Sequence, residues 1–135
     1  MDVAAFLADH RDDDVCRLVT IGHKSGTPHD IEIWFGVLPG TATVTLICGG
    51  GERSHWYRNL RAEPAVRVRI GETWLAGRAR AVADGPDRKA AGEVMGGKYG
   101  WWGGDISEGL TIEKWTWTVP AVLIDDLRPE AGAGD

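Results

Sequence analysis

The amino-acid sequence predicts a mainly β protein, folded as a closed or split β-barrel that carries one short and one longer helix. About six short segments alternate apolar with polar residues, and turns rich in glycine and proline separate them. A parallel α/β sheet needs a crossover connection between its strands, so the pattern disfavours that class. A chain of 135 residues has room for one domain with a core of its own.

The first half of the chain predicts three strands joined by turns. Residues 15–21 alternate along their length, and a polar turn at residues 22–28 follows them. Residues 29–37 alternate in the same way, and the Pro-Gly pair at residues 39–40 predicts a hairpin turn into a strand at residues 41–48. Together these segments predict a β-meander.

A short helix is predicted after the third strand. Residues 54–61 place Trp56 and Leu60 on one face, with Tyr57 as a further inward candidate, and Ser54 stands at the N-cap position. The Glu-Pro pair that follows ends the helix.

Two further strands and the longer helix come next. Residues 65–70 and 73–83 form a predicted hairpin, in which Gly77 marks a bulge or bend. The helix begins at residues 84–87, with a proline in its first turn, and the glycines at residues 96–97 are expected to stop it.

The rest of the chain predicts a loop and a last strand. Residues 96–109 hold Tyr99, Trp101 and Trp102 among glycines, a composition typical of an ordered but mobile lid. The last strand is expected at residues 117–124.

These elements place the barrel domain at residues 15–127. Residues 1–14 are predicted as a helical or flexible segment, and residues 128–135 as a disordered tail. No apolar run is long enough to span a bilayer, and no signal peptide is predicted. Cys16 and Cys48 lie in apolar segments without metal-ligand spacing, so we expect buried free thiols, a reducing cytoplasm and no metal.

The formal net charge of −5 argues against a nucleic-acid partner, because phosphate backbones bind basic faces. Arginines nevertheless crowd the middle of the chain. Two interpretations stay open: a site for a small anionic ligand, or a solvated sheet face. These arginines are Arg58, Arg61, Arg67, Arg69, Arg78 and Arg80.

A glycine loop follows the third predicted strand. Gly49, Gly50 and Gly51 lead from a strand to a helix start, where free N–H groups and the helix dipole favour an anion. The loop therefore indicates either an anion cradle or a plain strand-to-helix connection.

Three motifs, taken in order, carry a resemblance to a known family. Residues 19–26 read VTIGHKSG, residues 55–70 read HWYRNLRAEPAVRVRI, and residues 77–80 read GRAR. In this order they resemble the deazaflavin (F420)-dependent nitroreductase family. The resemblance covers residues 15–125. It implies a split β-barrel of the FMN-binding type, a homodimer, and an F420H2-dependent reductase acting on quinones, nitro compounds or activated alkenes.

The resemblance also implies roles for particular residues. It implies that the turn binds the phosphate or acidic tail of the cofactor and that the flat ring lies beside the start of the short helix. It also implies that the aromatic segment at residues 99–102 covers the substrate. The cofactor-binding residues implied are His23, Lys24, Ser25, His29, Gly49, Gly50, Gly51, Arg53, Ser54 and Trp56, and the substrate-binding residues are Tyr99, Trp101 and Trp102.

Two positions depart from the family pattern. His23 and His29 stand where the family has arginine, so a switchable charge replaces a permanent one. Alternatives to F420 therefore stay open. They are FMN, and a cofactor-free barrel that catalyses a non-redox step or binds a small hydrophobic ligand.

Two residues are candidates for the proton donor. His55 lies just inside the helix start, where it is either a donor or a solvated group. Tyr99 either donates a hydrogen bond to a developing oxyanion or anchors the lid without a chemical role.

Overall fold

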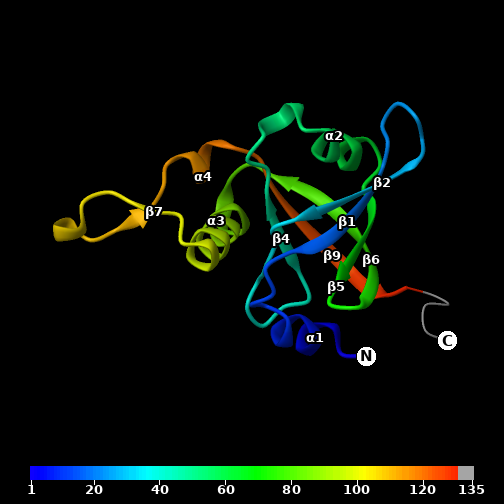
Figure 1. Cartoon of the computed structure of the whole chain (residues 1–135), viewed down its shortest axis with the longest axis horizontal. Coiled ribbons are helices and arrows are strands. Elements are labelled where there is room, and N and C mark those ends of the chain that lie inside the picture. The colour runs from blue at the N-terminus through cyan, green and yellow to red at the C-terminus, as the bar shows by residue number, and fades with distance from the viewer. Residues whose placement is uncertain (131–135) are drawn as a thin grey trace.

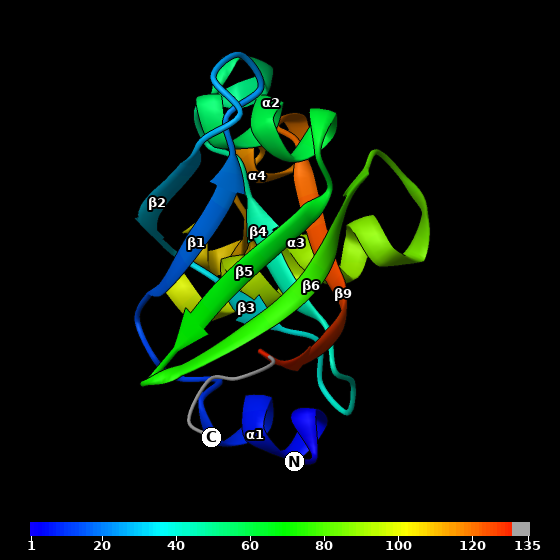
Figure 2. The same ribbon diagram turned by 90° about the vertical axis from the view of Figure 1, so that its right-hand side faces the viewer.

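A computed structural model describes residues 1–130, and most of the tail predicted at residues 128–135 lies outside the described residues. One curled antiparallel sheet forms the body, in the strand order β2-β1-β5-β6-β9-β4-β3. Its strands are β1 (Cys16–Ile21), β2 (Pro28–Ile33), β3 (Gly36–Val37), β4 (Val44–Ile47), β5 (Ala65–Ile70), β6 (Thr73–Val82) and β9 (Ala121–Pro129). The mainly β prediction is confirmed (Figures 1 and 2).

Helices cover the two ends of the barrel, with α2 (His55–Ala62) at one end and α1 (Val3–Asp9) at the other (Figure 2). The longer helix α3 (Gly85–Tyr99) packs beside β4 and β9. The short helical turns are η1 (Gly51–Arg53), η2 (Ile106–Glu108) and α4 (Trp115–Thr118). Among residues 1–130, no helix has the length and apolar character needed to cross a membrane.

The predicted meander is wrong, because residues 29–37 form two strands instead of one. The first, β2, pairs with β1 at one edge of the sheet, and the second, β3, pairs with β4 at the other edge. The chain bends between them at Trp34 and Phe35 and so links the two edges of the curled sheet.

Side chains of α3 make this bend possible. The main-chain N–H of Phe35 donates to the Tyr99 hydroxyl at 3.0 Å, and Lys98 Nζ donates to the Phe35 carbonyl at 2.8 Å. The Phe35 side chain is fully buried. A buried main-chain group must find a partner, and here a helix supplies what a neighbouring strand would otherwise give.

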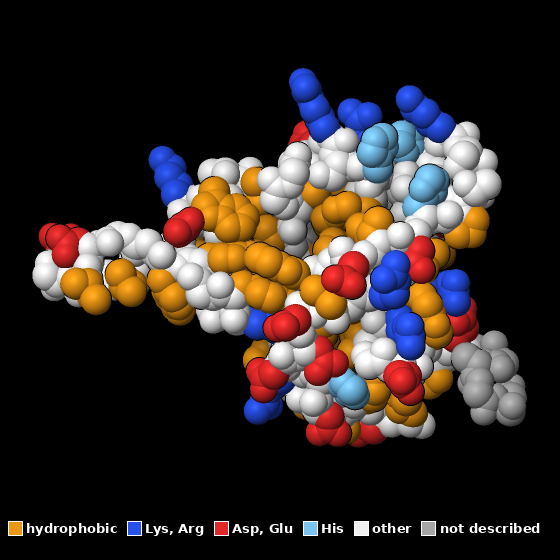
Figure 3. Space-filling view, in the orientation of Figure 1, with side chains coloured by type: hydrophobic (Ala, Val, Ile, Leu, Met, Phe, Trp, Pro, Cys, Tyr) orange, Lys and Arg blue, Asp and Glu red, His pale blue; other side chains and the backbone are white. Residues whose placement is uncertain are grey.

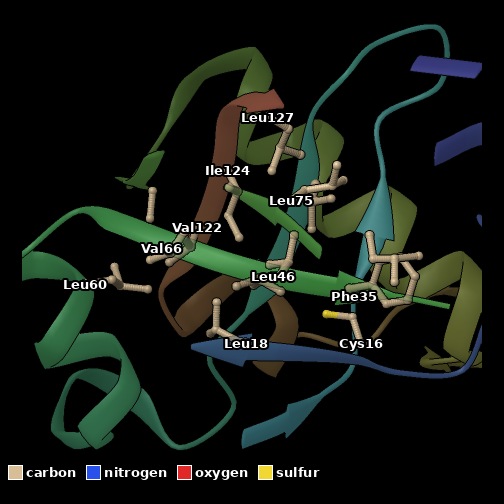
Figure 4. Packing of buried hydrophobic residues seen from close by; sticks show 14 of the residues in the cluster. Cys16, Leu18, Phe35, Leu46, Leu60, Val66, Leu75, Val122, Ile124 and Leu127 are labelled. Atoms are coloured by element: carbon tan, nitrogen blue, oxygen red, sulfur yellow. The ribbon is translucent and has the colours of Figure 1, made fainter. Parts of the chain in front are cut away.

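The core lies inside the curl of the sheet (Figure 4). Along β5 the side chains alternate, and Val66, Val68 and Ile70 are all buried. Leu18, Leu46 and Leu75 from the neighbouring strands are fully buried with them. Cys16 and Cys48 are free and buried, and burial raises the pKa of the Cys16 thiol to about 12.

The bulge predicted at Gly77 is confirmed. The β6–β9 register shifts between Ala76 and Arg78. A side chain at Gly77 would place its Cβ 2.7 Å from Leu127 and 2.9 Å from Ile124. Glycine therefore lets β9 cross β6 closely at this point.

The longer helix does not stop at residues 96–97 as predicted. It continues to Tyr99 and ends at Gly100, whose φ of 69° is left-handed. Gly96 instead gives room for a neighbour, because a Cβ there would lie 2.8 Å from Ile112. Gly96 is therefore a packing position within the helix, while Gly97 has open space around it, and neither ends the helix.

The segment predicted as an ordered but mobile lid, residues 96–109, contains the end of α3, β7 and η2. After α3, the chain forms a small arm (residues 102–112), in which β7 (Trp102–Gly103) pairs with β8 (Thr111–Ile112). The arm extends away from the body (Figure 1). The last strand also differs from its prediction at residues 117–124, since α4 precedes Pro120 and β9 runs from Ala121 to Pro129.

Candidate functional site

Three adjoining cavities follow helix α2 and form one path, which we call the groove. The first, the histidine end, has a volume of about 360 Å³, the middle about 730 Å³, and the third, the arginine end, about 630 Å³. His23 and Lys24 line both the histidine end and the middle. Glu52, Tyr57 and Arg61 line both the middle and the arginine end. The histidine end is lined by Gly22, His23, Lys24, Ser25, His29, His55 and Asn59.

Asn59 fixes the histidine end from within α2. Its side-chain oxygen accepts from the main-chain N–H of His23 at 2.9 Å and lies 2.6 Å from His23 Nδ1. Its amide nitrogen donates to Thr20 Oγ1 at 3.0 Å. Both Asn59 and Thr20 are buried. The turn after β1 is therefore fastened to α2, and the His23 ring faces the ring of His55 at a centroid distance of 6.3 Å.

A second set of contacts shapes the same turn. The Gly22 N–H donates to the Thr27 carbonyl at 2.8 Å, and the Ser25 and Thr27 hydroxyls lie 2.8 Å apart. A Cβ at Gly22 would lie 2.7 Å from the His29 ring. Glycine therefore permits the turn to fold over itself and brings Ser25 and His29 to the edge of the cavity.

The groove carries surplus positive charge. Among residues 1–130, the sheet arginines Arg17, Arg67 and Arg80 are paired with acids. Within residues 1–130 the cations of the groove have no such partner, and the acid that lines the groove is Glu52. These unpaired cations are Lys24, Arg58, Arg61 and Arg88, together with His23, His29 and His55 when protonated. Figure 3 shows histidine side chains gathered beside lysine and arginine at this end.

The glycine loop is less open than the predicted cradle. The N–H of Gly51 donates to the Cys48 carbonyl at 2.9 Å, so it is not free for a ligand. The amide of Gly49 donates no hydrogen bond within residues 1–130 and Gly49 is exposed, whereas the amide of Gly50 faces the Cys48 thiol. Gly51 lines the arginine end, with a left-handed φ of 78°. Of the three predicted donors, Gly49 remains available, and neither Gly49 nor Gly50 lines the groove.

The other residues predicted around this loop lie outside the groove. Ser54 stands at the N-cap of α2, but its side chain makes no capping hydrogen bond. Instead it lies beside the Cys48 thiol, where it opposes the rise in pKa that burial causes. Arg53 is exposed, and Trp56 packs against the core. Neither lines one of the three cavities.

The predicted substrate residues form a separate surface. The Tyr99 ring stacks on Trp34 at 4.7 Å and on Trp101 at 5.6 Å, while Trp102 is exposed. The Tyr99 hydroxyl accepts from the Phe35 N–H and donates to the carbonyl of either Asp14, at 2.7 Å, or Phe35, at 2.9 Å. Burial raises the pKa of Tyr99 to about 12. The structure does not bring these residues to the groove.

Several groove residues were missed in the sequence. Asn59 had a usable signal, because it lies four residues after His55 and therefore on the same face of α2. Arg58 and Arg61 were noted only as part of the arginine-rich middle. Arg88 and Trp117 had no local signal, since α3 and α4 meet only in the folded chain.

A curled antiparallel sheet with helices at its ends and a cationic groove defines a class, the split β-barrel proteins. A solved structure described as an F420-H2-dependent reductase has a TM-score of 0.61 and 20% identity, covering 84% of this chain and 95% of that chain. A conserved hypothetical protein from Mycobacterium tuberculosis has a TM-score of 0.64 and 21% identity, covering 89% and 78%. These similarities confirm the split-barrel fold. No curated protein sequence matches.

Residues 8–97 match the F420H(2)-dependent quinone reductase family, and the chain belongs to that family. The resemblance read from the motifs is thereby confirmed. The protein is an oxidoreductase that depends on F420, so the FMN alternative becomes secondary.

The groove fits such a cofactor on its own chemistry. F420 carries a flat ring, a phosphate and an acidic tail, and therefore needs cations along an elongated path. Among residues 1–130, the groove offers cations that have no acidic partner along an elongated path. Lysine and arginine are the side chains that bind phosphate best.

Proposed function

We propose that the groove holds F420, with its phosphate and acidic tail at the histidine end and its flat ring further along α2. The observation that carries the proposal is the set of groove cations without acidic partners, in a protein whose net charge is −5. When bound, reduced F420 supplies a hydride, and one proton completes the two-electron reduction of the acceptor. The acceptor we propose is a small quinone, nitro compound or activated alkene. Both cysteines are free thiols, which suits the reducing cytoplasm as its compartment.

With the cofactor placed in this way, His55 binds the cofactor tail and does not act as the proton donor. Its ring faces His23 within the histidine end, beside Lys24 and away from the arginine end. Acid groups of the tail would favour the charged forms of both imidazoles, because a nearby opposite charge stabilises the ion. We therefore assign His23, Lys24 and His55 to the tail, with Ser25 and His29 at the edge.

Tyr57 is the phenol that faces the groove. It lines both the middle and the arginine end, and Arg61 Nη1 donates to its hydroxyl oxygen at 2.9 Å. Because the oxygen accepts from a cation, its own hydrogen is free to point into the groove, and the cation stabilises the phenolate left after proton transfer. We therefore propose Tyr57 as the proton donor in place of Tyr99.

Titration with F420 tests the placement of the cofactor. Tryptophan fluorescence should report saturable F420 binding and weaker binding of FMN. Lys24→Ala should weaken F420 binding by about tenfold or more, because it removes a charge-assisted contact. Lys89→Ala is the control, since Lys89 is exposed on α3 and pairs only with Glu93. Equal affinity of wild type and Lys24→Ala would place the cofactor elsewhere.

We propose that the protein is a homodimer through the surface of the arm. Exposed apolar side chains gather there: Trp34, Trp102, Ile106, Leu110 and Trp115. Figure 3 shows hydrophobic side chains in a band that runs onto the arm. A surface of this kind on a soluble protein marks an interaction site. One similar solved structure, 20% identical with a TM-score of 0.62, is described as a domain-swapped dimer, which supports the proposal.

Sedimentation equilibrium tests the dimer. The wild type should sediment as a dimer, and a double variant, Trp102→Glu with Leu110→Glu, should sediment as a monomer, because two buried carboxylates would be left without partners. Glu72→Lys, in the turn between β5 and β6, should leave the dimer intact. A monomeric wild type at micromolar concentration would contradict the proposal.

A further inference from the structure

The arginine end of the groove has a guanidinium at its base. Arg88 from α3 is 6% exposed and lines the cavity together with Trp117 from α4. Arg88 Nη2 donates to the carbonyl of Thr116 and, at 3.0 Å, to that of Val119. These bonds hold the segment before β9 against α3.

The charge of Arg88 has no counter-ion in the described chain. None of the ion pairs among residues 1–130 includes it, and its Nη1 is buried without a hydrogen-bond partner. Burial lowers the pKa of Arg88. Buried charges in proteins are normally paired, because an unpaired one loses hydration without compensation. Arg61 and Glu52 also line this cavity, so its side chains carry a net positive charge.

An indole forms the neighbouring wall. The Trp117 ring lies under the Arg88 guanidinium at 5.5 Å and is 39% exposed. The ring rests against α3 at Gly92, where a methyl group would overlap it. Arg88 Nη1 is itself buried, so an incoming oxygen reaches it only after a neighbouring side chain moves. A flat ligand can stack on the indole while its acid group reaches the guanidinium.

We propose that the arginine end binds a planar organic acid, an aromatic ring that carries a carboxylate or an equivalent anionic oxygen. On the proposed function, on which this inference rests, that acid is the acceptor: a quinone, nitro compound or activated alkene whose ring also carries the anionic oxygen, and which lies next to the cofactor. Tyr57 stands between the two sites, because it lines both the middle and the arginine end. Acceptor and cofactor must then bind together, not in competition.

Two probes of nearly the same shape separate charge from stacking: 2-naphthoate and the neutral 2-naphthamide. Their affinities for the full chain are measured by calorimetry, without F420 and with saturating F420. The wild type should prefer the naphthoate by about tenfold or more, the ratio expected of a charge-assisted hydrogen bond. Arg88→Gln should abolish this preference, both without F420 and with F420 present. Thermal unfolding confirms that each variant is folded.

Gly92→Ala is the matched variant, because it displaces Trp117 and leaves Arg88 in place. Alanine is favoured over glycine within a helix, so α3 itself should persist. We expect weaker binding of both probes with their ratio kept. A naphthoate preference that survives Arg88→Gln would overturn the proposal. Arg88 would then have only the structural role of holding α4 against α3. Displacement of naphthoate by F420 would also overturn the proposal, because the two ligands would then share one site. Failure of the wild type to bind F420, with naphthoate bound, would instead contradict the proposed function.

Discussion

Asn59→Leu should weaken F420 binding by about tenfold or more and lower the free energy of unfolding by about 2–4 kcal/mol. The Asn59 side chain is the acceptor for the main-chain N–H of His23 and the donor to the Thr20 hydroxyl. Leucine has a similar volume but can make neither bond. Each buried polar group left without a partner costs about 1–3 kcal/mol, and the turn that carries Lys24 loses its attachment to α2.

Thr20→Val is the control that separates stability from binding. It removes the bond between Asn59 and Thr20, while both contacts between Asn59 and His23 remain. We expect a loss of stability with nearly unchanged F420 affinity. Urea unfolding and fluorescence titration measure the two quantities on the same samples. If both variants weaken F420 binding equally, the fastening of His23 is not what shapes the site.

The two tyrosines should respond oppositely to loss of the hydroxyl. Tyr57→Phe should lower the rate of acceptor reduction by about a hundredfold or more, the range of a lost general acid, with little change in F420 affinity. The reason is its place in the groove, where Arg61 holds the phenol oxygen. Single-turnover oxidation of F420H2 with a quinone such as menadione measures the rate.

Tyr99→Phe should instead lower the free energy of unfolding by about 1–3 kcal/mol and leave the rate within a few-fold of wild type. Its hydroxyl is the partner of the Phe35 N–H at the bend that joins β2 to β3, so phenylalanine leaves that buried group unpaired. Each variant serves as the control for the other. A large rate loss in Tyr99→Phe, with Tyr57→Phe active, would restore Tyr99 as the proton donor predicted from the sequence.

Some residues of the groove could be predicted from the sequence. His23, Lys24, Ser25, His29 and His55 were predicted as site residues, and the fold brings all five to one cavity. They come from two segments whose motifs are local, a polar turn after a strand and the start of a helix. Asn59 belonged to the second motif and was overlooked, although its spacing from His55 indicates the same helix face.

The sequence by itself determined the strands whose pattern is local. Alternation along residues 65–70 follows directly from a sheet with one buried face, and the bulge at Gly77 follows from a residue without a side chain. Only the tertiary structure decided the rest. The bend at Phe35 depends on Tyr99, 64 residues away, and Gly96 and Gly92 of α3 give room to side chains that arrive from β8 and α4. The Arg88 cavity exists because α3 and α4 meet. Local patterns record which face of a strand or helix is buried, but the partners of a buried polar group are chosen by the fold.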